Sequence, residues 1–136
     1  MNNKTTTLDA VTLTNNGTLT ITDTTGNGKI TSANQDTITN TGTLTKTGNA
    51  TIENTASTTY NAIRNTGTAT IESGSITATN TAILNTSAGT LIIGINEQTP
   101  EVSITNPSIT GTVCGVNVQG GTFNFYDGII KGAEGK

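Results

Sequence analysis

The chain of 136 residues contains no histidine and no tryptophan, and it has one cysteine. Without histidine, the usual general base of a serine or cysteine nucleophile is missing. A single cysteine, Cys114, excludes an internal disulfide and a cysteine-based metal cluster. Because Cys114 falls at an inward position of the strand pattern described below, we expect a buried and inert thiol.

Charge is also scarce, since only 11% of the residues are charged and the net charge is −3. Lysine and arginine form no cluster, which argues against nucleic-acid binding. The longest apolar run, Leu91-Ile92-Ile93, is too short to span a membrane, so no membrane insertion is expected. The segment Met1–Thr7 has no hydrophobic stretch and predicts no signal peptide. Either the protein stays inside the cell or, as we favour, the sequence is a piece of a longer chain.

Apolar residues make up 31% of the chain and aromatic residues 3%, which is less than an ordinary globular core requires. Disordered chains of low hydrophobicity usually carry high charge, which this chain lacks. Its threonine and isoleucine content favours strands. A solenoid fits both facts, because each rung needs few inward side chains and the neighbouring rungs complete the core.

What the chain does have is a repeat, Asn-x-Gly-Thr followed by alternating apolar and polar residues. Its copies are Asn15–Ile21, Asn40–Thr45, Asn65–Ile71, Asn85–Ile93 and, more loosely, Gln119–Phe125. The repeat glycines Gly17, Gly42, Gly67, Gly89 and Gly121 follow one another at steps of 25, 25, 22 and 32 residues. Self-similarity at a period of about 20–50 residues indicates stacked repeats rather than one globular core.

The repeats align with three short strands per turn and no helical spacing. We therefore predict an all-β fold, a right-handed parallel β-helix of about five rungs without helical caps. The helix spans residues 8–132, between a disordered or N-terminal extension at 1–7 and a C-terminal tail at 133–136. Strands are expected after each Gly-Thr, before each repeat Asn, and on a third face at 29–31, 50–53, 75–77, 102–105 and 128–131.

Three stacks of inward side chains follow from this alignment. The first holds Leu19, Leu44, Ala69, Leu91 and Phe123; the second holds Leu13, Ile38, Ile63, Ile83 and Val116; the third holds Ile30, Ile52, Ile76, Ile104 and Ile129. The repeat asparagines Asn15, Asn40, Asn65 and Asn85 are expected at one corner. Asparagine tolerates left-handed backbone and can bond to its copy one rung away, so we predict a structural amide ladder.

Two segments interrupt the period. The turn 23–28 is longer than its counterparts, and the segment Gly94–Gly111 supplies most of the residues added in the longest step. Insertions in solenoids often lie on the binding face, which makes Asn96, Glu97, Gln98 and Glu101 the candidate partner-binding loop. A tolerated loop without a partner is the alternative, because long surface insertions cost little.

The turn at Asp23 resembles a calcium-binding loop of the EF-hand or dockerin type, with Asp23 and Asn27 at its first and fifth positions. With one carboxylate this is a weak calcium candidate, and a glycine-rich turn is favoured. No other metal or cofactor is expected. Paired carboxylates for glycan cleavage are not assembled, because Glu53 and Glu72 occupy different faces. We therefore expect no enzyme.

Outward Thr-x-Thr rows, Thr20/Thr22, Thr43/Thr45/Thr47 and Thr68/Thr70, resemble those of ice-binding proteins. In this sequence Lys46 and Glu72 interrupt the rows, and Ile92 and Asn124 end them. Because threonine is also a good exposed strand residue, strand propensity is the simpler explanation.

The segment 61–76, Asn-Ala-Ile-Arg-Asn-Thr-Gly-Thr-Ala-Thr-Ile-Glu-Ser-Gly-Ser-Ile, resembles repeats of the pectate-lyase-like adhesive domains on Gram-positive bacterial surface proteins. Segments 81–85 and 121–132 fit the same pattern. The resemblance implies a non-catalytic module of a cell-wall or secreted adhesin, acting as a stalk or as a platform for a host protein or glycan. The alternative is a structural fibre unit that joins end to end as a homo-oligomer.

Overall fold

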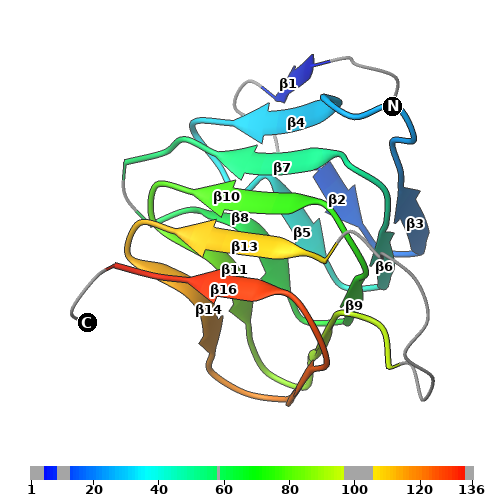
Figure 1. Cartoon of the computed structure of the whole chain (residues 1–136). Helices are drawn as coiled ribbons and strands as arrows, with labels where there is room; N and C mark the ends of the chain where they lie inside the picture. Colours follow the sequence, from blue (N-terminus) through cyan, green and yellow to red (C-terminus); the bar gives the residue numbers. More distant parts are fainter. Residues whose placement is uncertain (1–4, 9–12, 58, 97–105, 134–136) are drawn as a thin grey trace.

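The computed structural model of the chain describes residues 5–8, 13–57, 59–96 and 106–133, and these form three parallel sheets. Figure 1 shows the strands stacked in rungs from the N-terminal strand at the top to β16 at the bottom. The described residues contain no helix. The predicted all-β solenoid of about five rungs with three strands per rung is therefore confirmed.

The strands succeed one another in the order sheet A, sheet B, sheet C. Sheet A consists of β1 (Thr5–Leu8), β4 (Lys29–Ser32), β7 (Thr51–Asn54), β10 (Ser75–Ala78), β13 (Ser108–Gly111) and β16 (Ile129–Lys131). Sheet B consists of β2 (Leu13–Asn15), β5 (Ile38–Asn40), β8 (Asn61–Asn65), β11 (Thr81–Asn85) and β14 (Cys114–Val118). Sheet C consists of β3 (Thr18–Ile21), β6 (Thr43–Lys46), β9 (Thr68–Ile71), β12 (Thr90–Ile93) and β15 (Thr122–Phe125).

The register of sheets B and C places corresponding repeat residues side by side. In sheet C, Leu19, Leu44, Ala69, Leu91 and Phe123 are successive partners. In sheet B the partners are Leu13, Ile38, Ile63, Ile83 and Val116. Most of these side chains belong to one continuous core cluster, because alternate strand residues point to the same side.

Sheet A differs from the prediction at both ends. β13 lies at Ser108–Gly111 rather than at 102–105, and Ile109 takes the place expected of Ile104, which lies outside the described residues. In β16 the partner of Ile109 is Ile130, while Ile129 pairs with Ser108 and is 52% exposed. The inward assignment of Ile129 was therefore wrong by one residue, which reverses the side of the sheet that a side chain faces. At the other end, β1 pairs with β4 and begins inside the segment 1–7 that we assigned to an extension.

The glycine of the repeat is required by the closeness of successive rungs. A Cβ on Gly42 would collide with the backbone oxygen of Gly17, and one on Gly67 would collide with that of Gly42. Gly17, in the first copy, would meet nothing within 4 Å. The repeat glycine therefore allows the turn between sheets B and C to stack directly on the turn before it.

The repeat asparagines form the predicted ladder. The Nδ2 atom of Asn15 donates to Oδ1 of Asn40 at 2.7 Å, Asn40 donates to Asn65 at 2.7 Å, and Asn65 donates to Asn85 at 2.7 Å. Left-handed backbone is not the reason for these asparagines, because the described non-glycine residues with positive φ are Asn27 and Ser87. The ladder satisfies buried polar groups at a corner where neighbouring turns meet.

Candidate functional site

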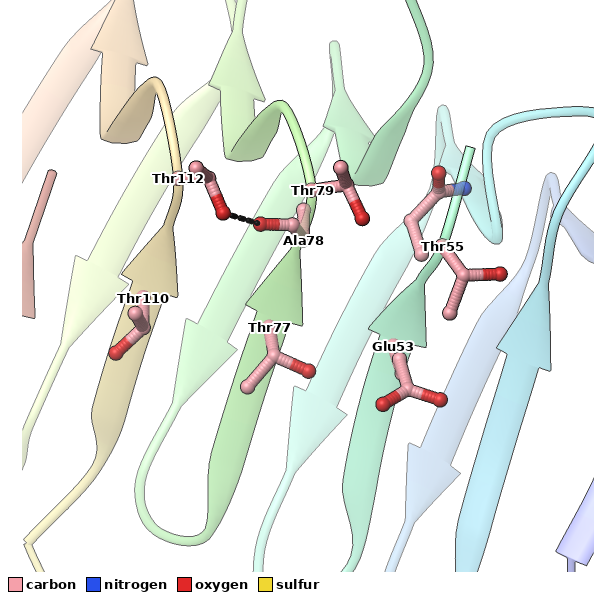
Figure 2. Close-up of a pocket in the computed structure, with 8 residues that line it drawn as sticks. Glu53, Thr55, Thr77, Ala78, Thr79, Thr110 and Thr112 are labelled. Atoms are coloured by element: carbon pink, nitrogen blue, oxygen red, sulfur yellow. Dashed lines mark hydrogen bonds between the residues drawn. The ribbon is translucent and has the colours of Figure 1, made fainter. Parts of the chain in front are cut away.

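One hollow on the described surface lies on the outer side of sheet A. It has a volume of about 250 Å³ and is lined by Glu53, Asn54, Thr55, Thr77, Ala78, Thr79, Thr110 and Thr112. Figure 2 shows that these residues come from β7, β10, β13 and the turns that follow them. Glu53, Thr77 and Thr110 are direct partners across the three strands. Strand alternation therefore presents one carboxylate and a series of hydroxyl groups along the rod.

The hydroxyls of the hollow differ in how they are bonded. The Thr112 hydroxyl donates to the backbone oxygen of Ala78 at 3.5 Å, and that of Thr55 donates to the backbone oxygen of Ser32 at 3.4 Å. The Thr77 Oγ1 atom is buried and has no hydrogen-bond partner among the described residues. A buried hydroxyl without a partner is uncommon in folded proteins. Because this oxygen is shielded from solvent, its unused bonding capacity lies beneath the surface of the hollow.

Glu53 is held at the edge of the hollow by the rung before it. The Lys29 ammonium donates to the two carboxylate oxygens at 3.1 and 3.2 Å, and the Thr31 hydroxyl donates to Oε2 at 3.1 Å. The side chains of Lys29 and Glu53 are 37% and 27% exposed. Such an exposed ion pair adds little stability, but it fixes the direction of the carboxylate.

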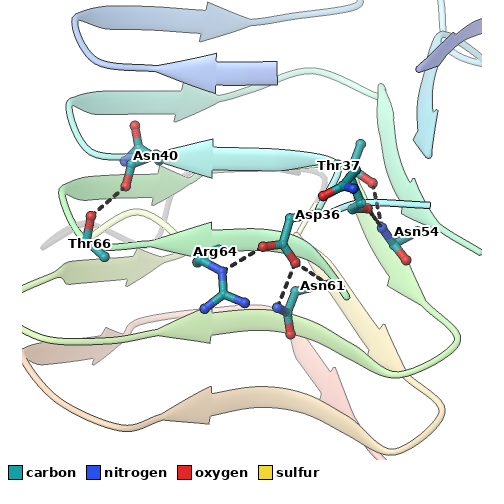
Figure 3. A network of polar contacts seen from close by, with 8 residues as sticks. Asp36, Thr37, Asn40, Asn54, Asn61, Arg64 and Thr66 are labelled. Atoms are coloured by element: carbon teal, nitrogen blue, oxygen red, sulfur yellow. Dashed lines mark hydrogen bonds and ion pairs between the residues drawn. The ribbon is translucent and has the colours of Figure 1, made fainter. Parts of the chain in front are cut away.

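A second polar cluster lies on the outer side of sheet B. Asp36 accepts hydrogen bonds from the backbone nitrogen of Asn61 at 2.7 Å and from its side chain at 2.9 Å, and Arg64 Nε contacts the other carboxylate oxygen at 2.6 Å. Figure 3 shows Asp36 between Arg64 and Asn61. All of these contacts join the turn before β5 to β8. The cluster therefore ties one rung to the next.

In the candidate calcium loop, the carboxylate of Asp23 accepts hydrogen bonds from other residues of the same loop. Asp23 is buried and accepts hydrogen bonds from the Thr25 nitrogen at 3.1 Å, the Thr25 hydroxyl at 3.0 Å and the Gly28 nitrogen at 2.6 Å. Burial favours the neutral acid, but these hydrogen bonds outweigh it and hold the pKa of Asp23 below its ordinary value. Asn27 is exposed with φ of 79°. The described residues contain no group of three or more side chains of the kinds that bind metal ions.

Lys46 was misplaced by the sequence prediction. Its side chain does not interrupt the outward threonine row but points inward, between Ile21 and Ile71, and is 0% exposed. The ammonium donates to the backbone oxygens of Ser73 at 2.8 Å and Gly48 at 3.2 Å. Burial lowers the pKa of Lys46 to about 8, and the negative charge of Asp23 opposes this shift. The alternation Leu44-Thr45-Lys46 was the signal that could have placed it inward.

The other predicted residues are placed as follows. Asn96 is exposed, whereas Glu97, Gln98 and Glu101 lie outside the described residues, as does most of the candidate partner-binding loop. β13 at Ser108–Gly111 forms the C-terminal end of the predicted insertion Gly94–Gly111. Cys114 is half-buried rather than buried, and its Sγ contacts the backbone oxygen of Val116 at 3.2 Å.

The outer side of sheet C carries a threonine column that is longer than the sequence suggested. Thr18, Thr43, Thr68, Thr90 and Thr122 are successive partners. In the neighbouring column Thr20, Thr45 and Thr70 are followed by Ile92 and Asn124. None of the outward side chains on the described strands of sheet C is charged.

Comparison of this chain with protein-family models, with curated proteins and with solved structures finds no match. Within the described residues, no helix is long and apolar enough to cross a membrane.

Proposed function

We propose that this chain is a non-catalytic β-helix module of a bacterial cell-surface or secreted adhesin, acting as a rigid stalk or as a ligand-binding platform. The observation that carries the proposal is the unbroken register of three sheets along the rod, reinforced by the asparagine ladder. Such a scaffold holds its outward side chains at fixed spacing over several rungs. A binding face on a rigid scaffold loses little conformational entropy when a ligand docks.

The buried carboxylates support a non-catalytic role. Asp23 accepts three hydrogen bonds from its own turn, and Asp36 accepts bonds from Asn61 and Arg64. A glycosidase needs one carboxylic acid and one carboxylate facing each other across a substrate. Asp23 and Asp36 instead act as structural acceptors at two different turns.

Binding of the 136-residue chain to immobilised mucin, hyaluronan, collagen and fibronectin tests the proposal. We expect saturable binding to at least one of these materials. We expect no release of reducing sugar from mucin or from hyaluronan. An Ile63→Asp variant serves as the unfolded control and should not bind. Absence of binding to the whole panel, or sugar release by the folded chain alone, would contradict the proposed role.

End-to-end assembly is a second candidate, favoured by the apolar surface of the last described rung, β14 to β16. Its exposed large apolar side chains are Val113, Val118, Phe123, Phe125, Tyr126 and Ile129. Strand edges with exposed apolar residues are prone to pair with other chains. Sedimentation velocity over a hundredfold concentration range should then show growing oligomers, and Phe125→Lys should suppress them. A monomer at every concentration would exclude this candidate.

A further inference from the structure

We propose that the last described rung, β14 to β16, is the docking surface for a second copy of this chain, which is turned tail to tail to form a closed pair. The inference goes beyond the proposed adhesin role, because it assigns a partner to the apolar end of the rod and needs no other ligand. It also limits end-to-end assembly to two chains, whereas a fibre would continue to grow.

The inward positions of β15 distinguish this end from the rest of the rod. In the four earlier strands of sheet C these positions hold aliphatic residues or Lys46, whereas β15 holds Phe123 and Phe125, the two phenylalanines of the chain. Their rings stack with centroids 6.5 Å apart, and the residues are 36% and 48% exposed. Val118 is the register partner of Asn85, so an exposed apolar residue takes the place of the ladder asparagine. A gathering of exposed apolar side chains of this kind is typical of a contact surface.

The N-terminal end of the rod offers a different surface. On β1, Thr6 is the register partner of Ile30, and Thr5, Thr6 and Thr7 are all exposed. Ile21 and Ile30, which are inward residues near this end, are only 5% and 8% exposed. Apolar surface gains most when it is covered by apolar surface. The last described rung therefore fits its own copy better than it fits the N-terminal end.

Two copies can join at this end by continuing all three sheets. β14, β15 and β16 are the last strands of sheets B, C and A, so each has one edge without a strand partner in the described chain. Figure 1 shows β14 and β16 at the lower end of the rod. Because the chain forms these strands in succession, β16 extends furthest along the rod and β14 least.

A half-turn matches these stepped ends to each other. If its axis passes through the middle of β15, perpendicular to the rod, β15 meets its own copy, and β14 and β16 change places. The strand that extends least then meets the strand that extends furthest, so the two ends are complementary. The half-turn also reverses the strand direction, so the new pairs are antiparallel and their edge N–H and C=O groups find partners.

The register across the junction follows from the side that each residue faces. Opposite residues of an antiparallel pair lie on the same face of the sheet, so inward Phe123 must lie opposite an inward residue of the second copy. Centring the pair on outward Asn124 satisfies this condition. Asn124 then lies opposite its own copy, and Phe123 lies opposite Phe125 of the second copy. Four phenylalanine rings would share the interior of the junction.

Charge and size set the strength of the pair. Residues 113–133 contain one acidic and one basic side chain, Asp127 and Lys131, so this end has no net charge that would repel its copy. The segment has 21 residues, at the lower end of the about 20–30 that one side of a standard interface contains. We expect a reversible dimer with a dissociation constant on the order of 10 μM. Two platforms in one pair would bind a surface with higher avidity than a single chain.

Sedimentation velocity of the 136-residue chain tests the stoichiometry. Over a hundredfold concentration range around this dissociation constant, we expect one species of 13.8 kDa and one of twice that mass, with nothing larger. Phe125→Lys should weaken the dimer at least about tenfold, because it places an ammonium group among the phenylalanine rings. Thr20→Lys adds the same charge to the exposed outer side of sheet C in the first rung and should leave the dimer unchanged. Circular dichroism should show that both variants keep the fold.

Cysteine cross-linking in a Cys114→Ser background tests the half-turn itself. Asn124→Cys places a thiol opposite its own copy, at a separation suited to a disulfide. Asn117→Cys is the matched control, because Asn117 is also half-buried and outward in the same rung, but β14 lies opposite β16 of the second copy. Under mild oxidation, the Asn124→Cys chain should form a covalent dimer at least about tenfold faster than the Asn117→Cys chain. Non-reducing electrophoresis measures both rates.

Three outcomes would overturn the inference. Oligomers larger than a dimer that grow with concentration would replace the closed pair by the fibre. A monomer at every concentration would exclude both the pair and the fibre. Equal cross-linking of the two cysteine variants would exclude the half-turn through β15. The adhesin proposal is decided separately, by binding to mucin, hyaluronan, collagen or fibronectin, and it stands if that binding is found in any of these cases.

Discussion

The middle rung, β8 to β10, and the last described rung, β14 to β16, are built from the same repeat but differ in burial. In the middle rung Ile63, Ala69, Ile71 and Ile76 are all 0% exposed. Their counterparts Phe123 and Phe125 in the last described rung are 36% and 48% exposed, although they occupy the same inward positions. The repeat sequence therefore determines the side to which a residue points, and in the middle rung, which has a neighbouring rung on each side, these residues are completely buried.

The largest difference between the two rungs should appear when a charge is placed in the core. Ile63 packs between Ile38 and Ile83, so Ile63→Asp buries a carboxylate without a partner. We expect a loss of several kcal/mol, which is comparable to the whole stability of a small domain, and the chain should not fold. Phe125→Asp should cost only about 1 kcal/mol, because the aspartate reaches water. Circular dichroism with urea titration measures both, and equal losses would contradict the comparison.

Lys46 tests what happens when the sequence itself places a charge in the core. Burial lowers its pKa in the folded state from 10.5 to about 8, so between these pH values the unfolded chain binds more protons. The free energy of unfolding should then rise as the pH increases from about 8 to 10.5, by up to about 3 kcal/mol relative to a Lys46→Met chain. Urea titrations at several pH values check this. Parallel curves for the two chains would mean that Lys46 keeps an ordinary pKa.

The loss of stability on removing an asparagine of the ladder should depend less on the rung than the loss on placing a charge in the core. The side chain of Asn65 bonds to Asn40, Asn85 and the backbone oxygen of Thr90, so Asn65→Ala leaves buried polar groups unpaired on both sides. We expect a loss of about 2 kcal/mol. Asn15→Ala interrupts the ladder on one side only and should cost about 1 kcal/mol. Thermal unfolding of both variants decides; a larger loss for Asn15→Ala would reverse the expected order.

The smallest effect is expected on the outer side of sheet C. Thr68 and Thr122 belong to the same outward column, and Thr→Ser at either position removes one methyl group from the surface. Both variants should lose less than about 0.5 kcal/mol of stability. A loss above 1 kcal/mol at Thr68 would mean that outward side chains of the middle rung also contribute to stability.

The sequence was sufficient to predict sheets B and C because a fixed marker accompanies them. Each Asn ends a strand of sheet B and each Gly-Thr begins a strand of sheet C, and the register in the structure follows these residues. The turns at Gly42 and Gly67 lie so close to the turns before them that glycine is required there, so the spacing of the Asn-x-Gly-Thr motif matches the rungs. Strong local constraints of this kind can be read directly from spacing.

Sheet A has no such marker, and there the prediction failed in part. Both Val102-Ser103-Ile104 and Ser108-Ile109-Thr110 alternate in the manner of a strand, and only the contacts of neighbouring rungs select β13. The inward place of Lys46 was hidden because charge suggests the surface, although alternation suggests the core. The hollow around Thr77 also depends on three strands separated in sequence, so no local pattern indicates it.

The side-chain amides of Asn15, Asn40, Asn65 and Asn85 all point the same way. Each Nδ2 atom donates to the Oδ1 atom of the next asparagine in the ladder. The direction is set at Asn15, whose oxygen accepts a bond from the Gly17 nitrogen, and it continues to Asn85, whose nitrogen meets the backbone oxygen of Gly120. Aligned side-chain dipoles add, and each bond polarises its neighbour. The rod therefore has an electrical polarity along its axis, and its two ends present different signs of partial charge at this corner.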